Sequence, residues 1–316
     1  AYEIGVRLVG SEMCIRDSFK TDKAGIIDIA VQGAKEVKRC AAAQPDTEWI
    51  FQYSPESFTG TEVDFAVEVC DAVNDIWKPT PERPSIINLP STVEMATPNI
   101  YADQVELFCR NIKNRDSIIV SLHTHNDRSC AVGAAELAVM GGAQRVEGTL
   151  LGNGERTGNM DIVVMAMNLY SQGIDPALDL HDMDRIVSIV RECTQIDVHP
   201  RQAYSGDLVF TAFSGSHQDA IKKCLDTYEE GSPWEIAYLP IDPRDIGRTY
   251  QDVIRVNSQS GKGGVAYVLA NKFGFQVPSG IYFYQLKAGD SFIQTKKMTP
   301  VSYTHLRAHE TDSYLV

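Results

Sequence analysis

The chain has 316 residues and 43% apolar content, enough for a sizeable core in one large α/β domain or two smaller ones. Its 29 basic and 42 acidic residues give a formal net charge of −13, which opposes non-specific attraction to nucleic acid and to anionic membranes. No apolar run approaches the roughly 18 residues of a membrane-spanning helix, and the seven cysteines form no C-x-x-C pair. We therefore expect a cytoplasmic protein with reduced thiols and no nucleic-acid or membrane partner.

The two ends, residues 1–18 and 301–316, fit no periodic pattern but are related through the genetic code. Codons can be chosen for Tyr2–Asp17 whose complementary strand translates as residues 301–316, without a break over sixteen positions. This relation predicts adapter-like, non-native ends, so we leave both out of the fold and give their histidines and cysteine no chemistry. The alternative is a pair of genuine terminal arms.

Strand and helix patterns alternate between residues 47 and 172. The predicted strands, rich in β-branched and apolar residues, are 47–54, 85–90, 117–124 and 145–152. The predicted helices are 61–77, 98–113 and 131–140. This alternation predicts a parallel sheet covered by helices, and so an α/β fold. After residue 172 the pattern turns helical, and residues 195–264 are rich in loop-forming residues.

Residues 278–300 show the alternation of a β-hairpin that turns at Ala288-Gly289-Asp290. The segment resembles the C-terminal sorting tails of proteins secreted by Bacteroidetes. Such a tail does not fit a cytoplasmic protein, so an assembly chimera and a native terminal hairpin both stay open.

Polar loops follow all four predicted strands. They read "YSPES", "LPSTVE", "LHTHND" and "LLGNGERTGN". In parallel α/β sheets the functional groups gather at the C-terminal ends of the strands. Any one of these segments is also consistent with an ordinary polar loop, but four at matching places favour a site.

His123 and His125 are the strongest candidates for a metal site. Side chains two residues apart on a strand share a face, so both imidazoles can ligate one divalent ion. The alternative is a pair of solvated or hydrogen-bonded histidines. A metal would need a further ligand, and the loop after the next strand offers Asn153, Glu155 and Asn159.

Two other residues are candidates with ordinary alternatives. Glu56 follows Pro55 just past a strand end and is either a catalytic carboxylate or a surface glutamate. His217 lies among small residues that leave room for a ligand, although a helix cap around Ser216 explains the segment equally well. "GNGERTG" has one residue too many for a dinucleotide fingerprint, "SQSGKGG" fails as a phosphate loop, and no G-x-S-x-G elbow occurs.

Eight ordered blocks between residues 20 and 277 resemble the 2-isopropylmalate synthase family. The blocks are "DKAGIIDIAVQGAKEVK", "YSPESFTGTEVDFA", "LPSTVE", "SLHTHNDR", "RVEGTLLGNGERTGN", "FTAFSGSHQDAIKK", "YLPIDPRDIGRTY" and "RVNSQSGKGGVAY". The resemblance implies the C-terminal half of a (β/α)8 TIM barrel in residues 19–180, its last four βα units, followed by a mostly helical linker subdomain in 181–277. It also implies a divalent cation (Mg, Mn or Zn) and the condensation of acetyl-CoA with 2-oxoisovalerate in leucine biosynthesis.

The same resemblance implies roles for single residues. The metal ligands would be His123, His125 and Asn159. The acid–base residues would be Glu56, His217 and Tyr250, the last two from a linker region that in this family commonly reaches the partner subunit's active site, which implies a homodimer. The residues beside the 2-oxo acid would be Ser54 and Thr92.

The chain also departs from the family pattern. It contains no D-x-T-x-R-D-G motif, which in the family supplies an Asp metal ligand and a catalytic Arg. From the resemblance we also expect the first four strands and the leucine-sensing domain to be absent from these 316 residues. We therefore expect the isolated chain to be poorly stable and inactive, because a half-barrel exposes an unpaired sheet edge. The alternatives are a homocitrate or citramalate synthase of the same superfamily, and a non-catalytic or secreted chimeric protein.

Overall fold

The computed structural model describes residues 20–212, 214–248, 282–288 and 292–298, and both predicted adapter-like ends lie outside them. The chain divides into two compact units. One reaches Leu178 and includes Val190–Val198; the other consists of Asp179–Ile189 and the residues from His199 onward.

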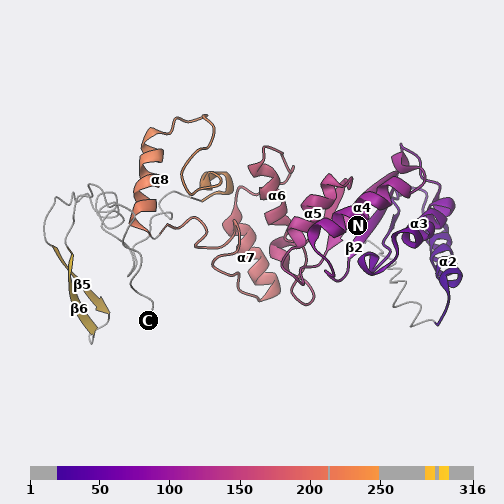
Figure 1. Cartoon of the computed structure of the whole chain (residues 1–316), viewed down its shortest axis with the longest axis horizontal. Helices are drawn as coiled ribbons and strands as arrows, with labels where there is room; N and C mark the ends of the chain where they lie inside the picture. Colours follow the sequence, from indigo (N-terminus) through magenta and orange to yellow (C-terminus); the bar gives the residue numbers. More distant parts are fainter. Residues whose placement is uncertain (1–19, 213, 249–281, 289–291, 299–316) are drawn as a thin grey trace. The chain divides into compact units, whose positions relative to one another are not determined.

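The first unit contains four strands and most of the helices (Figure 1). Its elements are α2 (Lys23–Ala42), β1 (Gln52–Tyr53), η1 (Phe58–Gly60), α3 (Val63–Trp77), β2 (Ser85–Ser91), α4 (Pro98–Asn111), η2 (Arg115–Ser117), β3 (Ile118–Thr124), α5 (Ala131–Met140), β4 (Arg145–Glu147), η3 (Leu150–Gly152) and α6 (Ile162–Ser171). Helix α7 (Met183–Thr194) has residues in both units.

The four strands form one sheet in the order β1-β2-β3-β4, and every neighbouring pair is parallel. Each strand therefore lies beside the strand that precedes it in the chain, and helices follow the strands in between. Successive helices α2 to α5 contact one another in the same order (Figure 1). The predicted α/β class with a helix-covered parallel sheet is confirmed.

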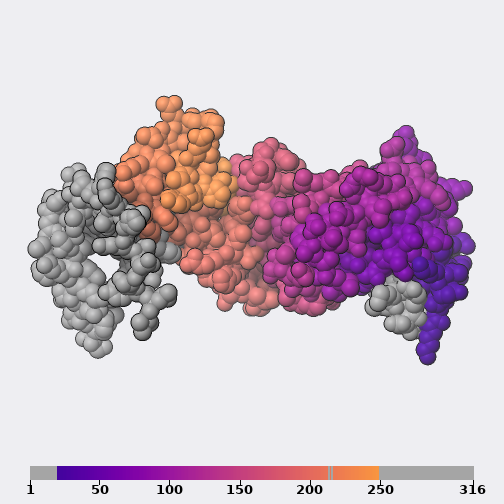
Figure 2. Space-filling model, in the orientation of Figure 1, coloured from indigo at the N-terminus to yellow at the C-terminus, as the bar shows by residue number. Residues whose placement is uncertain are grey.

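The core lies between the helices and one face of the sheet. Alternate residues of β2 and β3, namely Ile87, Leu89, Val120 and Leu122, are at most 1% exposed and belong to one apolar cluster with residues of the helices. The residues between them face the other way. The surface of this unit is the part of Figure 2 that is coloured from indigo to magenta.

Local signals fix where the helices begin. Asp22 accepts a hydrogen bond from the Gly25 N–H at the start of α2, and Asp161 accepts from the Val163 N–H at the start of α6, so both aspartates are N-caps. Helix α2 is not among the elements predicted above. The indole of Trp77 in α3 donates to the Ala34 carbonyl, which links the two helices.

Two predicted strands are shorter than expected. β1 is confined to Gln52–Tyr53 rather than 47–54, and β4 ends at Glu147 rather than residue 152. Within the described residues each pairs with one neighbour only, which limits the ladder that can form. After β4 the chain turns so that Thr149 pairs with Asp161, and this replaces the continued strand.

The second unit holds shorter elements. They are α8 (Gly215–Thr227), η4 (Pro243–Ile246), β5 (Tyr282–Ala288) and β6 (Phe292–Met298). The guanidinium of Arg248 donates to the carbonyls of Ser205 and Gly206 and to Asp184, so it joins three segments of this unit. Strands β5 and β6 are antiparallel, with Ala288 opposite Phe292, and the predicted hairpin is present.

Within the described part of the chain, no helix combines the length and the apolar composition that crossing a membrane requires. The six cysteines in that part are all free thiols.

We predict that Phe108→Ala lowers the free energy of unfolding of the chain by about 3–5 kcal/mol, measured by urea titration. Phe108 is fully buried, and its ring packs edge-on against Phe58 at 5.9 Å between centroids. The matched control is Leu107→Ala, one position earlier in α4, where the side chain is 50% exposed. An equal loss in both variants would contradict the core described above.

Candidate active site at the strand ends

The parallel register places polar residues of three strands level with one another on the face that does not meet the helices. Asn88, Ser121 and Arg145 are in register in one row, and His123 and Glu147 are in register in the next, beside Pro90 of β2. The sheet thus changes from apolar on its helix side to polar on the opposite side. The second row lies at the strand ends, where the predicted site residues are.

His123 is held on both ring nitrogens. Its Nδ1 lies 3.3 Å from the Glu147 carboxylate, and its Nε2 lies 3.1 Å from the Asn159 amide nitrogen. Because a carboxylate only accepts hydrogen bonds, Nδ1 carries the proton and Nε2 keeps its lone pair. This tautomer leaves Nε2 able to ligate a metal.

His125 is buried, at 9% exposure, and its Nδ1 has no hydrogen-bond partner among the described residues. Burial lowers the pKa of its imidazole, and the nearby positive charge of Arg156 acts in the same direction. The ring is therefore neutral near pH 7. The two imidazole centroids are 5.3 Å apart, and the backbone of His125 pairs with that of Asn159.

Glu147 is the centre of the polar row. Burial raises the pKa of its carboxyl, but hydrogen bonds from His123, Arg145 and Gln52 outweigh this and lower the pKa from 4.5 to about 2. The amide of Asn88 also donates to Glu147, over 3.2 Å. The carboxylate is thus ionised and fixed in place, which in turn fixes the ring of His123.

Ser54, Glu56 and Thr92 lie at the ends of β1 and β2. The hydroxyl oxygen of Ser54 accepts a hydrogen bond from Asn88, and that of Thr92 accepts one of 2.7 Å from the Ser57 N–H. Glu56 is half-buried, and among the described residues it has no hydrogen-bond or ion-pair partner. Its carboxylate is therefore available to a ligand.

The loop after β4 needs its glycines for close packing. A Cβ at Gly158, where φ is +97°, would lie 2.0 Å from the Gly152 carbonyl oxygen, and one at Gly154 would lie 2.0 Å from the Asn159 side-chain oxygen. "GNGERTG" is therefore a tight loop that presents Asn159 to His123. This agrees with its failure as a dinucleotide fingerprint.

These side chains fit a divalent cation as part of its ligand set. Among the described residues, no group of three or more His, Cys, Asp or Glu side chains could hold a metal ion. What the strand ends bring together is two neutral imidazoles and one amide, with the buried Nδ1 of His125 still lacking a partner. Neutral imidazole and amide oxygen are both ligands of divalent metals.

Asn153 and Glu155 are not part of this group. Asn153 donates its amide to the Leu150 carbonyl, and the Glu155 side chain is 86% exposed. His217 belongs to the second unit, where it is exposed and stacks on Tyr238 at 4.1 Å between ring centroids. Tyr250 lies outside the described residues.

The sequence reasoning missed Glu147 and Asn88. A usable signal was present, because Arg145 and Glu147 flank Val146 in a short strand, and Asn88 interrupts the apolar run of β2. Charged and amide side chains inside strands that are buried on one face point to the other face.

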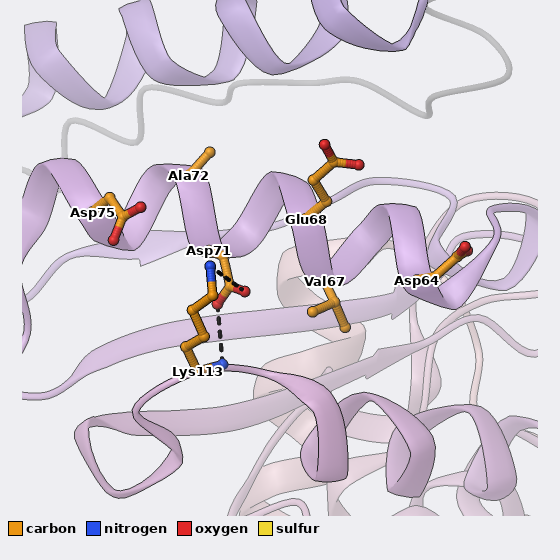
Figure 3. A pocket seen from close by; sticks show the side chains of 7 residues that line it. All are labelled: Asp64, Val67, Glu68, Asp71, Ala72, Asp75 and Lys113. Carbon is orange, nitrogen blue, oxygen red and sulfur yellow. Dashed lines mark hydrogen bonds and ion pairs between the residues drawn. The ribbon is translucent and has the colours of Figure 1, made fainter.

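A surface pocket of about 360 Å³ is lined by residues other than those at the strand ends (Figure 3). It is lined by α3 and by Lys113, whose ammonium lies 3.5 Å from Asp71. None of its lining residues comes from the strand-end loops. It therefore adds nothing to the candidate site.

The fold and these strand ends define a class of α/β protein in which a helix-covered parallel sheet carries a polar site at its C-terminal edge. The HMGL-like family model matches residues 1–190, and a second model, described as alpha-isopropylmalate synthase, post-catalytic domain-like, matches residues 207–270. The chain belongs to the HMGL-like family, a family of TIM barrels.

Curated relatives agree with this membership. The 2-isopropylmalate synthases of Pseudomonas entomophila and Alcanivorax borkumensis are 60% and 64% identical over 275 and 260 residues, which is 86% and 82% of this chain. These matches cover 49% and 46% of the relatives, so the chain spans about half the length of the curated relatives it matches. A crystal structure of HMG-CoA lyase from Bacillus subtilis aligns with a TM-score of 0.45 and 16% identity, covering 60% of this chain and 62% of that one.

We predict that Glu147→Gln removes a pH-dependent part of the stability. The folded-state pKa lies below the ordinary value, so the stability that the carboxylate contributes is present above pH 4.5 and is lost as the pH falls toward 2. The difference in free energy of unfolding between the original chain and the variant should therefore shrink over this range, measured by urea titration at several pH values. Glu155→Gln, at an exposed position, is the control, and a difference that stays constant with pH would count against the ion-pair network.

Proposed function

We propose that this chain is part of a 2-isopropylmalate synthase, an acyltransferase that condenses acetyl-CoA with 2-oxoisovalerate in leucine biosynthesis. The observation that carries the proposal is the 60% identity to a curated synthase across 275 residues. A cytoplasmic location and a homodimer complete the proposal. The free thiols of the described residues are consistent with the location, and the homodimer rests on the family resemblance alone.

In this proposal His123, His125 and Asn159 hold a divalent cation. Mg, Mn and Zn are the candidates, because each binds imidazole or amide-oxygen ligands. When bound, the cation polarises the ketone of the 2-oxo acid and stabilises the negative charge that develops on its oxygen. The contact between Glu147 and His123 supports the role, because it keeps the proton on Nδ1 and so leaves Nε2, the nitrogen that would ligate the metal, unprotonated.

Two hydroxyl groups are suited to orient the carboxylate of the 2-oxo acid. The Thr92 oxygen already accepts from the Ser57 N–H, and the Ser54 oxygen already accepts from Asn88, so the hydrogen of each hydroxyl is available to donate. Both donors stand at neighbouring strand ends. They would fix the acid so that its ketone faces the place where acetyl-CoA is deprotonated.

Glu56 is the proposed general base, and it takes a proton from the methyl group of acetyl-CoA. The carbon–hydrogen electron pair forms the enolate, which attacks the ketone carbon, and water then cleaves the thioester and releases CoA. His217 and Tyr250 are proposed to contribute to this proton transfer from the linker region. The half-buried carboxylate of Glu56, without a competing partner in the described part of the chain, supports its role.

We predict that residues 20–277, placed into the aligned segment of the Pseudomonas entomophila enzyme, give a chimera that releases CoA only when acetyl-CoA and 2-oxoisovalerate are both present. In this chimera Glu56→Gln should lower kcat by roughly 10²–10⁴-fold, because the amide cannot accept the proton. Glu48→Gln, at an exposed position ahead of the same strand, is the control.

An inactive chimera that folds would contradict the proposal and favour the alternative that the chain is a non-catalytic protein. A preference shifted toward 2-oxoglutarate or pyruvate, relative to the Pseudomonas entomophila enzyme, would favour homocitrate or citramalate synthesis instead.

We further predict that His125→Ala weakens Mn²⁺ binding by the 316-residue chain by about tenfold or more, since the change removes one proposed ligand. Binding is measured by the loss of the free Mn²⁺ signal in electron paramagnetic resonance. His181→Ala is the control, because His181 is exposed in the second unit. Equal affinities of the two variants would remove His125 from the ligand set.

A further inference from the structure

Arg156, in the loop after β4, connects the strand-end loops to one another. Its Nε and Nη2 donate to the two carboxylate oxygens of Asp127 over 2.7 and 3.1 Å, so the ion pair is bidentate. The same Nη2 donates to the Thr92 carbonyl over 2.7 Å. We call Arg156, Asp127 and Thr92 the arginine clasp; it joins the loops that follow β2, β3 and β4.

The clasp extends to the loop after β1. The Thr92 side-chain oxygen accepts from the Ser57 N–H, so the turn that carries Glu56 is attached to the same residue whose carbonyl Arg156 holds. Asp127 also accepts from the Glu94 N–H over 3.0 Å, which fixes the chain two residues beyond Thr92. The proposed base and one proposed hydroxyl donor are therefore positioned by one network.

The exposure of the clasp indicates positioning rather than a large contribution to stability. The Arg156 side chain is 40% exposed, and exposed ion pairs contribute little to stability. Its geometry is nevertheless specific, because a planar guanidinium can hold both carboxylate oxygens and a carbonyl at once, whereas the ammonium of lysine has no matching fork.

We propose that Arg156 and Asp127 are positioning residues for the 2-oxo acid site, acting through the Thr92 carbonyl and the Ser57 N–H. The inference rests on the proposed function. Neither residue touches a reacting atom in it. Their effect is to keep the Thr92 hydroxyl and the Glu56 carboxylate in a fixed relation to the metal-binding histidines.

The first test needs no activity and uses the 316-residue chain. Hydrogen–deuterium exchange is compared between the original chain, Arg156→Gln and Arg110→Gln, a control that breaks an exposed ion pair on α4. The clasp predicts faster exchange in residues 55–60 and 91–95 for Arg156→Gln only, with unchanged exchange in α3. Loss of protection throughout the first unit, or in neither loop, would overturn the clasp.

The second test uses the active chimera described above and separates positioning from a merely structural role. Arg156→Gln and Asp127→Asn should each raise KM for 2-oxoisovalerate roughly fivefold to tenfold, the effect of losing about 1 kcal/mol, with KM for acetyl-CoA unchanged. The double variant should raise this KM by less than the product of the two single effects, because both variants break the ion pair that the two residues share. Arg156→Lys should fall between Arg156→Gln and the original residue.

Equal changes in both KM values, or none, would overturn the inference while leaving the proposed function intact. If the chimera with Arg156 present shows no turnover, the proposed function fails, and the exchange experiment alone decides whether the clasp holds the loops.

Discussion

The contact between Glu147 and His123 is the interaction on which the candidate site depends. Parallel register puts the two residues level on adjacent strands, so their side chains leave the sheet at the same height and on the same face. The carboxylate then determines which nitrogen of the imidazole carries the proton. A slip of one residue in β4 would send Glu147 into the apolar layer under the helices and leave His123 without this partner.

The rest of the polar face supports that contact. A half-buried carboxylate is costly unless its oxygens accept hydrogen bonds, and here Gln52, Arg145 and Asn88 supply the donors from β1, β4 and β2. The apolar layer on the other side of the sheet keeps the strands in register, because Leu89 and Leu122 are fixed against the helices. Along each strand, side chains alternate between the apolar face under the helices and the polar face of the site. This alternation therefore determines both the core packing and the site geometry.

Much of this arrangement could be predicted from the sequence. Strand periodicity, with polar segments at matching ends, predicted the parallel sheet and the edge of it at which Ser54, Thr92 and His123 lie. The limits of β1 and β4 could not be predicted, because they depend on which neighbours are available for pairing and on the pairing of Thr149 with Asp161. Helix α2 had a local signal, the capping Asp22, that the strand-centred pattern overlooked.

The contacts of the site were harder to predict than its location. Arg156 is a charged residue in a chain that is 22% charged, and nothing local separates it from surface residues, whereas the local signal of Glu147 was only its place in a short strand. Their roles arise from contacts over long sequence separations, such as that between Arg156 and the Thr92 carbonyl. A loop with positive φ at Gly152, Arg156 and Gly158, in which Cβ atoms at Gly154 and Gly158 would clash with neighbouring atoms, brings Arg156 and Asn159 back over the strand ends. One loop thus presents the amide beside His123 and the guanidinium that connects the neighbouring loops, so its shape links the proposed metal ligands to the proposed site of the 2-oxo acid.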